Sequence, residues 1–322
     1  MSHVSADALR GHVAFLSSDL LEGRDTPSRG LNIAAEYIAT QFALIGLEPA
    51  GSVGYFQKAT VSRRGETYSS QNVAGLLRGS DPKLRDQYVI VSSHYDHIGV
   101  ASTGDDRIFN GANDDASGVA TVLETASALA SLHPHPKRSV LFLLFFGEEK
   151  GLLGSQYYAA HPLKPLEQTV AQLNLEQMGR TDSSEGPKLK SANLTGWEYS
   201  TLTQTLVEAG RQAGVTIAKD PKASDAYFNR SDNAPLARLG IPAHTMSVTY
   251  EFPDYHAVGD EWQKIDYANM AQVDRAVALT VLRLASSPAT LKWNPSYGRA
   301  RPFFEAAQKL NATRPALSQS RP

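Results

Sequence analysis

The chain of 322 residues contains no cysteine. Disulfide bonds, thiolate metal sites and a cysteine nucleophile are therefore excluded, and any metal ion must be held by nitrogen and oxygen ligands. The sequence also lacks a Gly-x-Ser-x-Gly segment, which carries the nucleophile of many serine hydrolases. This second absence argues against a serine hydrolase.

An excess of charge of either sign is absent as well. Lysine and arginine total 31 against 33 acidic residues, which gives a net charge of -2. Because this balance offers no attraction to polyanions, we expect no nucleic-acid partner and no membrane partner. No apolar run approaches the length of a membrane span, and residues 1–6 lack the features of a secretory signal. We expect a secreted or periplasmic protein if a signal peptide was removed, and a cytoplasmic one otherwise.

The chain alternates between helical and strand patterns, and 42% of its residues are hydrophobic. Apolar residues recur at helical spacing in 6–16, 31–47, 117–132, 198–213, 233–239 and 267–285. Short apolar runs predict strands at 72–77, 87–93, 139–146, 170–175 and 243–248. This order predicts an α/β three-layer sandwich with a mainly parallel central sheet flanked by helices. We expect one domain over residues 1–290 and a loosely packed C-terminal tail over 291–322, with one short helix at 303–309.

Side chains that can bind metal ions follow the ends of several predicted strands. In open α/β sheets, ligands lie beyond the carboxyl ends of the strands, so these side chains are expected to converge. Another acidic pair lies in a turn, Gly-Ala-Asn-Asp-Asp-Ala-Ser-Gly, that leads into a helix. The residues at these positions are His94, Asp96, His97, Asp114, Asp115, Glu148, Glu149 and Glu176.

Each motif taken alone also has an ordinary structural explanation. His94 and its neighbours can form a plain loop, and Asp114 and Asp115 can cap the helix that follows them. Glu148 and Glu149 are harder to explain in this way, because adjacent carboxylates after an apolar strand need a cation or a proton to neutralise them.

At this point the sequence resembles the co-catalytic di-zinc exopeptidases that include bacterial leucyl aminopeptidases, with glutamate carboxypeptidase and glutaminyl cyclase as relatives. The resemblance covers the chain from Leu9 to about Ile265, and its motifs occur in the order of the family. They are Phe15-Leu16-Ser17-Ser18-Asp19, Leu21-Glu22-Gly23-Arg24, His94-Tyr95-Asp96-His97, the segment from Asn110 to Gly118, Gly147-Glu148-Glu149, Gly151-Leu152-Leu153-Gly154-Ser155, Asn174-Leu175-Glu176, Ser231-Asp232, and Tyr255-His256 with Asp260.

The resemblance implies two zinc ions per chain in a zinc-peptidase catalytic domain. Asp114 would bridge the two ions, and Glu148 would be the general base. Asp96 would hold His94 in the tautomer that presents a lone pair to zinc. The remaining implied ligands are His94, Glu149, Glu176 and His256. The chain departs from the family at Glu176, where aspartate is usual, and at Asn233, where many members have histidine. His97 is left off the ligand set.

The function that follows from this resemblance is a metal-dependent exopeptidase acting on peptides, and we favour an aminopeptidase. A carboxypeptidase remains open because Arg180 or Arg230 could bind a terminal carboxylate. A glutaminyl-cyclase-like enzyme and a non-catalytic binding domain on the same scaffold are further alternatives, and the oligomeric state is open. Four aromatic residues are expected either to line the pocket for the first side chain or to pack in the core: Tyr227, Phe228, Tyr250 and Phe252.

Overall fold

A computed structural model describes residues 4–183 and 185–312 of the chain. In this part of the chain, nine strands form one sheet with the order β1-β3-β5-β4-β6-β9-β7-β8, and β2 pairs with β3 off this path. The strands are β1 (Glu48–Pro49), β2 (Phe56–Arg63), β3 (Glu66–Leu77), β4 (Tyr88–His94), β5 (Ser139–Phe145), β6 (Thr169–Leu175), β7 (Ser191–Leu194), β8 (Thr216–Ala218) and β9 (Ala243–Ser247).

The four central strands, β5, β4, β6 and β9, run parallel to one another. Every residue of β4, β5 and β6 is buried, as expected for parallel strands that are covered on both faces. Antiparallel pairs occur toward the two edges, where β3 pairs with β5 and β7 pairs with β9. The parallel centre places the carboxyl ends of four neighbouring strands at the same edge of the sheet.

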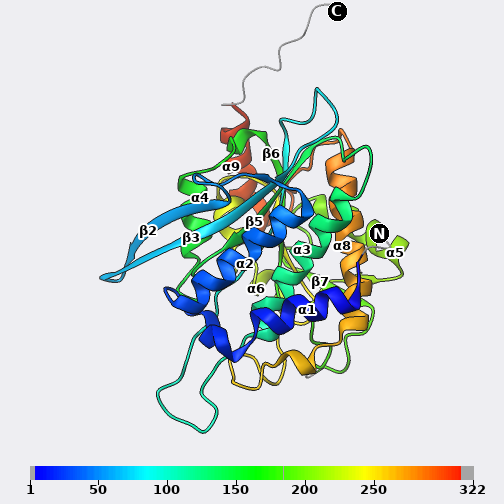
Figure 1. Cartoon of the computed structure of the whole chain (residues 1–322). Coiled ribbons are helices and arrows are strands. Elements are labelled where there is room, and N and C mark those ends of the chain that lie inside the picture. Colours follow the sequence, from blue (N-terminus) through cyan, green and yellow to red (C-terminus); the bar gives the residue numbers. More distant parts are fainter. Residues whose placement is uncertain (1–3, 184, 313–322) are drawn as a thin grey trace, which may run out of the picture.

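Helices cover both faces of this sheet (Figure 1). One layer contains α1 (Ala6–Leu16), α2 (Arg29–Ile45), α3 (Ser117–Ala130), α5 (Leu202–Ala213) and α8 (Tyr267–Ser286). The other contains α4 (Leu153–Ala160), α7 (Asn233–Arg238) and α9 (Arg301–Ala312), and the short helix α6 (Ala223–Ala226) lies in a connecting segment. The predicted α/β sandwich is confirmed. None of the helices in the described residues combines the length and apolar character that crossing a bilayer requires.

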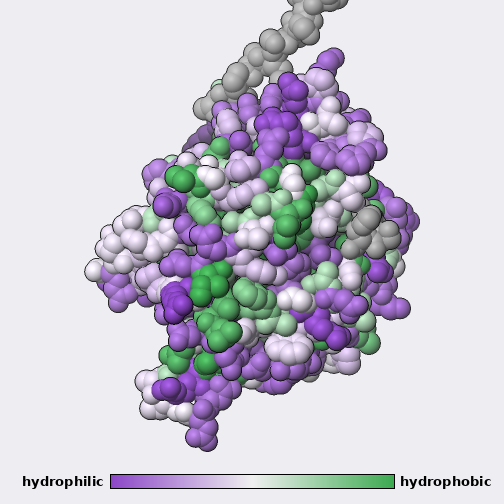
Figure 2. Space-filling model, viewed as in Figure 1, coloured by the Kyte–Doolittle hydropathy of each residue, from purple (hydrophilic) through white to green (hydrophobic). Residues whose placement is uncertain are grey.

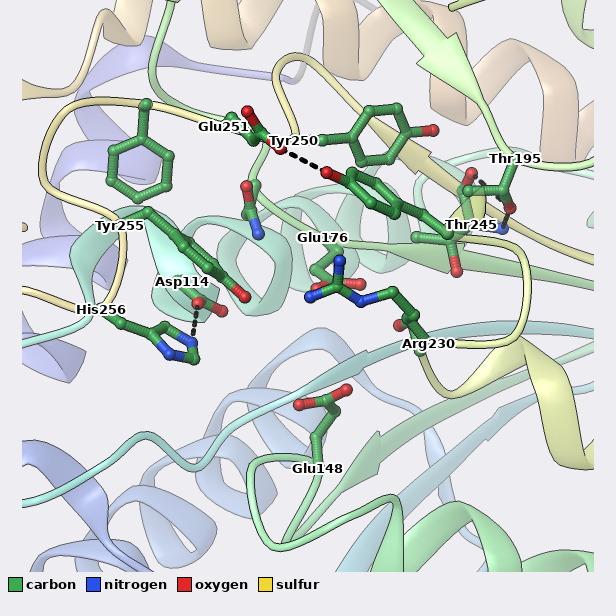
Figure 3. A pocket seen from close by; sticks show the side chains of 14 residues that line it. Asp114, Glu148, Glu176, Thr195, Arg230, Thr245, Tyr250, Glu251, Tyr255 and His256 are labelled. Carbon is green, nitrogen blue, oxygen red and sulfur yellow. Dashed lines mark hydrogen bonds and ion pairs between the residues drawn. The ribbon is translucent and has the colours of Figure 1, made fainter. Parts of the chain in front are cut away.

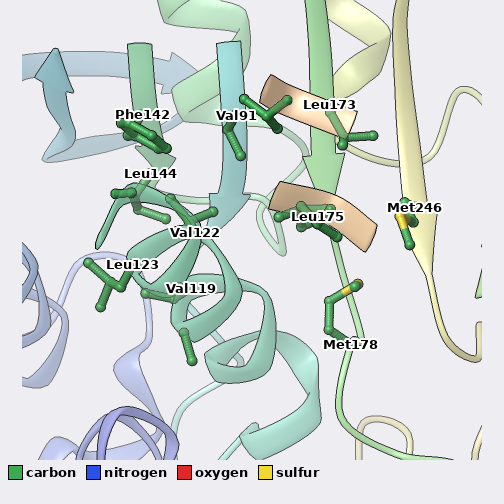
Figure 4. Close-up of a cluster of buried hydrophobic side chains, with 14 of the residues drawn as sticks. Val91, Val119, Val122, Leu123, Phe142, Leu144, Leu173, Leu175, Met178 and Met246 are labelled. Atoms are coloured by element: carbon green, nitrogen blue, oxygen red, sulfur yellow. The ribbon is translucent and has the colours of Figure 1, made fainter. Parts of the chain in front are cut away.

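Alternate side chains of the central strands divide the hydrophobic core into two halves. On β5, Phe142 and Leu144 face the layer of α3, whereas Leu143 and Phe145 face the opposite layer. Figure 4 shows the first half, in which Val122 of α3 packs under the strands. Burial on both faces fixes the positions of the strand ends, and so the positions of the polar residues that follow them.

A long antiparallel hairpin, β2–β3, projects from the edge of the sheet (Figure 1). It was not predicted, since only its buried end over 72–77 has a strongly apolar pattern. Arg63 pairs with Glu66 across a two-residue turn in which Arg64 and Gly65 both have positive φ, 51° and 85°. Such two-residue turns match the twist of antiparallel strands, which explains the tight closure.

The C-terminal segment packs more closely than expected. Trp293, Ala300 and Phe303 are 4%, 0% and 8% exposed and belong to the core on the side of α7. The indole Nε1 of Trp293 donates a hydrogen bond of 2.8 Å to the carbonyl of Gly240. The expectation of a loosely packed tail over 291–322 is therefore wrong for residues 291–312, and residues 313–322 lie outside the described part. The short helix predicted at 303–309 is α9.

Candidate metal centre

The acidic and imidazole residues singled out from the sequence gather at the carboxyl ends of the parallel strands. Figure 3 shows four of them, Asp114, Glu148, Glu176 and His256. His94 ends β4, Glu148 and Glu149 lie in the turn after β5, and Glu176 follows β6. Asp114 lies in the turn that leads into α3, and His256 comes from the loop between β9 and α8. The expected convergence of these six residues is observed.

Asp114 occupies the middle of this arrangement. Its Oδ1 lies 3.3 Å from Nε2 of His94, and its Oδ2 lies 3.2 Å from Nε2 of His256. Nε2 of His256 is also 3.2 Å from Oε1 of Glu149. Two atoms bound to one tetrahedral zinc ion at about 2.1 Å would be about 3.4 Å apart. The spacing of these nitrogen and oxygen atoms therefore fits shared coordination of metal ions.

Two groups of side chains in the described residues have ligand atoms close enough to hold an ion. One is His94, Asp114 and Glu176, and the other is His97, Asp114 and Glu149, with ligand atoms within 4.8 Å of one another in each. Asp114 belongs to both groups, which is the arrangement that a bridging carboxylate needs. Nε2 of His94 is buried and has no hydrogen-bond partner. A buried ring nitrogen of this kind fits a metal ligand, because an unpaired polar atom is costly.

His97 is the residue of this cluster that the sequence analysis left aside. Its Nδ1 lies 3.0 Å from Oε1 of Glu149, and its ring is fully buried and 5.6 Å from the ring of His256. The sequence signal for this contact is the second histidine of His-Tyr-Asp-His. Spacing alone could not show that the loop turns His97 toward Glu149.

Asp96 connects the ends of β4 and β5. Its backbone carbonyl lies 3.2 Å and its Oδ1 3.5 Å from Nδ1 of His94, consistent with the predicted orienting role. Its carboxylate also accepts hydrogen bonds from the backbone N–H groups of Glu148, at 3.1 Å, and Glu149, at 3.3 Å. One side chain thus positions both the histidine and the two glutamates, and the second of these roles was not foreseen.

The electrostatics of the site follow from its burial. Burial raises the pKa of Glu148 well above its usual range, and the neighbouring carboxylates of Glu176 and Glu149 raise it further. Hydrogen bonds to Asp114 and Glu149 raise the pKa of His256 to about 10. So many acidic groups in a dry site require cations or protons to compensate them. A Glu148 carboxyl of raised pKa is suited to accept and return a proton.

Hydrogen bonds hold the loop that carries Asp114. Asp260 accepts hydrogen bonds of 3.0 Å from the backbone N–H groups of Asn113 and Asp114. Asp115 belongs to neither group of possible ligands, and although its Oδ2 lies 3.8 Å from Nε2 of His94, its two carboxylate oxygens accept hydrogen bonds from Ser93 Oγ and from the backbone N–H of Gln177. The second aspartate of the pair is therefore structural.

A pocket of about 310 Å³ adjoins the centre, and Asp114, Glu148, Glu176 and His256 form part of its wall. Three of the four predicted aromatic residues, Tyr227, Tyr250 and Phe252, line it together with Tyr255. For Phe228 the other expected alternative holds, since it is fully buried and packs in the core against Tyr199, Trp293 and Phe303.

The two arginines considered for a terminal carboxylate differ in their surroundings. Arg180 is held by Asp182 at 2.6 Å and by Asp254 at 2.9 Å, so its charge is already neutralised. Arg230 lines the pocket and lies over the ring of Tyr227, 4.5 Å from its centroid. Asn233, the second departure from the family pattern, bonds to Phe228 and Thr245 and has a local structural role.

The fold and the site together are those of α/β enzymes that bind their ligands at the carboxyl ends of parallel strands. Over residues 72–281 the chain matches the family described as peptidase family M28, and it belongs to that family. The resemblance stated from the sequence motifs is thereby confirmed.

Three individual proteins to which the chain is similar share 19% to 28% of their aligned residues with it. A probable zinc metalloprotease of Pyrenophora teres f. teres is 28% identical over 316 residues, covering 90% of this chain and 66% of that protein. Aminopeptidase YwaD of Bacillus subtilis is 27% identical, covering 81% of this chain and 56% of that protein. The chain thus spans at most two thirds of the length of these relatives. Among solved structures, an aminopeptidase from Aneurinibacillus sp. strain AM-1 has the same fold, with a TM-score of 0.69, 19% identity and coverage of 91% of this chain and 97% of that one.

Proposed function

We propose that this protein is a metal-dependent exopeptidase, an aminopeptidase that removes the first residue of peptides with the help of two zinc ions. The observation that carries the proposal is the central position of Asp114, whose two oxygens face His94 on one side and His256 on the other. Membership of a peptidase family and similarity to proteins named zinc metalloprotease and aminopeptidase support it.

The ligand assignment follows the resemblance stated from the motifs. His94 and Glu176 would hold one ion together with Asp114, as in the first group of side chains. For the other ion we take His256, whose Nε2 lies 3.2 Å from both Asp114 and Glu149, in place of the His97 of the second group. Asp114 would bridge the two ions, and His97, 3.0 Å from Oε1 of Glu149, would orient that ligand through a hydrogen bond. Imidazole and carboxylate together suit zinc, and no thiolate is needed.

When bound, a pair of zinc ions would polarise the scissile carbonyl and lower the pKa of water. The chain itself supplies the proton transfers. Glu148 lines the pocket beside the ligands, so it can take a proton from the attacking water and give it to the leaving amine. Asp96 fixes the backbone of Glu148 through its N–H, which keeps the base in place during both transfers.

The aminopeptidase assignment rests on the acidic lining of the pocket. Glu148 and Glu176 lie where a terminal ammonium group could be bound, and burial, followed by the neighbouring carboxylates, raises the pKa of both, so a cation there would stabilise their charged forms. A carboxypeptidase would need an available cation for the terminal carboxylate. Arg180 cannot serve because two aspartates hold it, which leaves only Arg230 of the two candidates.

A matched panel of peptides tests this proposal. Free-amine, N-acetylated and C-amidated forms of one peptide would be incubated with the full chain saturated with zinc, with and without chelator. We expect release of the first residue from the free-amine and amidated forms only, and loss of this activity in chelator. Turnover of the N-acetylated form, or activity that survives removal of the metal, would refute the assignment.

A further inference from the structure

A second hollow, of about 490 Å³, is lined in part by the turn that carries Glu148 and Glu149. Glu148 lines the pocket described above, whereas Glu149 lines this hollow. Its remaining walls are the end of the β2–β3 hairpin and the residues after Glu149, namely Arg63, Arg64, Glu66, Tyr68, Lys150 and Gly151. Consecutive residues of one turn thus line the two cavities.

The end of the hairpin is hydrogen-bonded to the segment that follows Glu148 and Glu149. Arg63 donates a hydrogen bond through Nη1 to the carbonyl of Gly151. A Cβ atom at position 151 would lie 2.3 Å from the Arg63 guanidinium carbon, so a side chain there would displace the guanidinium from this carbonyl. Gly151 also has a φ of +98°, which side chains rarely adopt. The hairpin thus forms a built wall beside Glu149.

The lining of this hollow contains three cations, Arg63, Arg64 and Lys150, besides the carboxylates of Glu66 and Glu149, and among the described residues only Lys150 of the three has an ion-pair partner. Lys150 forms an ion pair of 2.8 Å with Asp25, and Glu66 bonds to the hydroxyl of Tyr68. The guanidinium of Arg63 contacts a neutral carbonyl, and Arg64 has no ion-pair or hydrogen-bond partner within residues 4–183 and 185–312. The hairpin surface in Figure 2 ranges from intermediate to hydrophilic, which fits a polar ligand better than an apolar one.

We propose that this hollow binds the C-terminal carboxylate of short peptide substrates, with Arg64 as a specificity-determining residue. The inference rests on the proposed aminopeptidase function. The base must reach both the attacked carbonyl and the leaving amine, so the scissile bond lies beside Glu148. With the first residue in the pocket, the rest of the peptide would pass this turn, and the hollow begins at Glu149, the residue next to the base. A residue spans at most about 3.6 Å, so only a short peptide ends there.

The test compares free-acid and amidated forms of peptides that begin with leucine and continue with one, two or five glycines. The kcat/KM ratio of acid to amide would be measured for the zinc-saturated full chain. We expect a ratio of about three to ten for a short peptide and about one for the longest. Arg64→Asn should bring the ratio close to one, since Asn-Gly keeps the hairpin turn while removing the charge. Arg64→Glu should lower it below one.

The matched control is Lys83→Gln, which removes one exposed cation. Lys83 precedes β4, so it lies toward the amino ends of the parallel strands, whereas the proposed site lies at their carboxyl ends. It should keep the ratio of the unaltered protein. Equal rates for acid and amide at every length, or an acid preference that survives Arg64→Asn, would overturn the inference while leaving the aminopeptidase proposal intact. Absence of turnover for acids and amides alike would refute the proposed function and this inference with it.

Discussion

Asp96 illustrates how much a single carboxylate can organise. It holds Nδ1 of His94 and also accepts the N–H groups of Glu148 and Glu149. The first contact could be predicted because His94 and Asp96 are near neighbours in sequence. The second could not, because it depends on β4 and β5 lying side by side in parallel register.

The role of Glu148 can be separated from metal binding by one substitution. Glu148→Gln keeps the shape of the side chain but removes its ability to accept a proton, so turnover should fall by about a hundredfold or more. Zinc content measured by elemental analysis should remain near that of the unaltered protein. Glu36→Gln, on the exposed face of α2, is the matched control and should retain full activity. A variant that loses its metal but keeps its activity would reverse the roles assigned to Glu148 and Glu149.

The two histidines near Glu149 should respond differently to removal. His256→Ala should lose about one of the two bound zinc ions on dialysis, because a direct ligand is removed. His97→Ala should keep both ions but bind one of them about 10- to 100-fold more weakly, as expected for a residue that orients a ligand. Titration of each variant with a competing chelator measures both effects. Equal metal loss in the two variants would place His97 among the direct ligands.

His244 shows that a buried histidine need not belong to the centre. Its Nε2 is 2.7 Å from Oγ of Ser200 and its Nδ1 is 2.8 Å from the carbonyl of Thr195, so both ring nitrogens have partners within the core. Burial lowers its pKa from 6.5 to about 4. Between these values the unfolded chain binds more protons than the folded one, so stability falls as the pH falls from 6.5 to 4.

The expected loss from His244 is about 2 kcal/mol of the free energy of unfolding between pH 7.5 and pH 5. Urea unfolding of the metal-free protein at both values measures the loss. His244→Asn, which retains a donor for the carbonyl of Thr195, should lose about 2 kcal/mol less than the unaltered protein over the same interval. An identical pH dependence in the two proteins would contradict a neutral His244.

At the scale of whole elements, the buried parallel strands were predicted closely, whereas the edges of the sheet were not. β4 and β5 contain continuous apolar runs, and β6 has apolar residues interrupted only by Gln172 and Asn174, so these strands are recognised without knowledge of their neighbours. The first half of β3 is partly polar, and β7 and β8 are short. These segments form strands only because they pair with a neighbouring strand. Helix α2 begins two residues earlier than expected because the hydroxyl of Ser28 caps it, accepting the N–H of Leu31.

At Gly154, helix α4 lies close to the end of β5, just before the turn that carries Glu148 and Glu149. A Cβ atom at this position would lie 2.3 Å from Oδ1 of Asn72 and 2.6 Å from the carbonyl of Phe146. Gly154→Ala should therefore cost about 1–3 kcal/mol of stability and displace the turn that carries Glu148, lowering kcat. Gly11→Ala is the control, because nothing lies within 4 Å of a Cβ atom there, and it should stabilise α1 by about 0.5–1 kcal/mol. Thermal unfolding and kinetics test both variants, and a Gly154→Ala protein as stable and active as the original would contradict this packing.

For the whole molecule, the sequence indicated where the centre would form but not how closely the last segment would pack. The positions of the predicted strand ends, together with the family motifs, were enough to predict that the proposed ligands lie close together. The tail was misjudged because its composition is rich in Pro, Arg, Ser and Gln, whereas its few large apolar side chains, Trp293 and Phe303, insert into the core beside α7. A small number of buried residues outweighs the average composition of a segment.

Removing that contact should therefore affect the entire domain. Trp293→Ala deletes a side chain that is 4% exposed and stacks on Phe303 with ring centroids 5.1 Å apart. The expected cost is about 3–5 kcal/mol of unfolding free energy, measured by denaturant titration. Leu20→Ala, at an 85% exposed position, should change stability by no more than about 0.5 kcal/mol. A Trp293→Ala variant as stable as the control would show that the segment is dispensable.

The proposed ligands are spread along most of the chain, from His94 to His256, yet they meet at one edge of one sheet. A ribosome must translate past residue 256 before the last of them exists, and α8 must follow before its face of the sheet is covered. Until then a growing polypeptide cannot assemble the proposed pair of ion sites. Binding of both proposed ions would therefore follow the synthesis of residue 256 and the folding of the sheet that gathers the ligands.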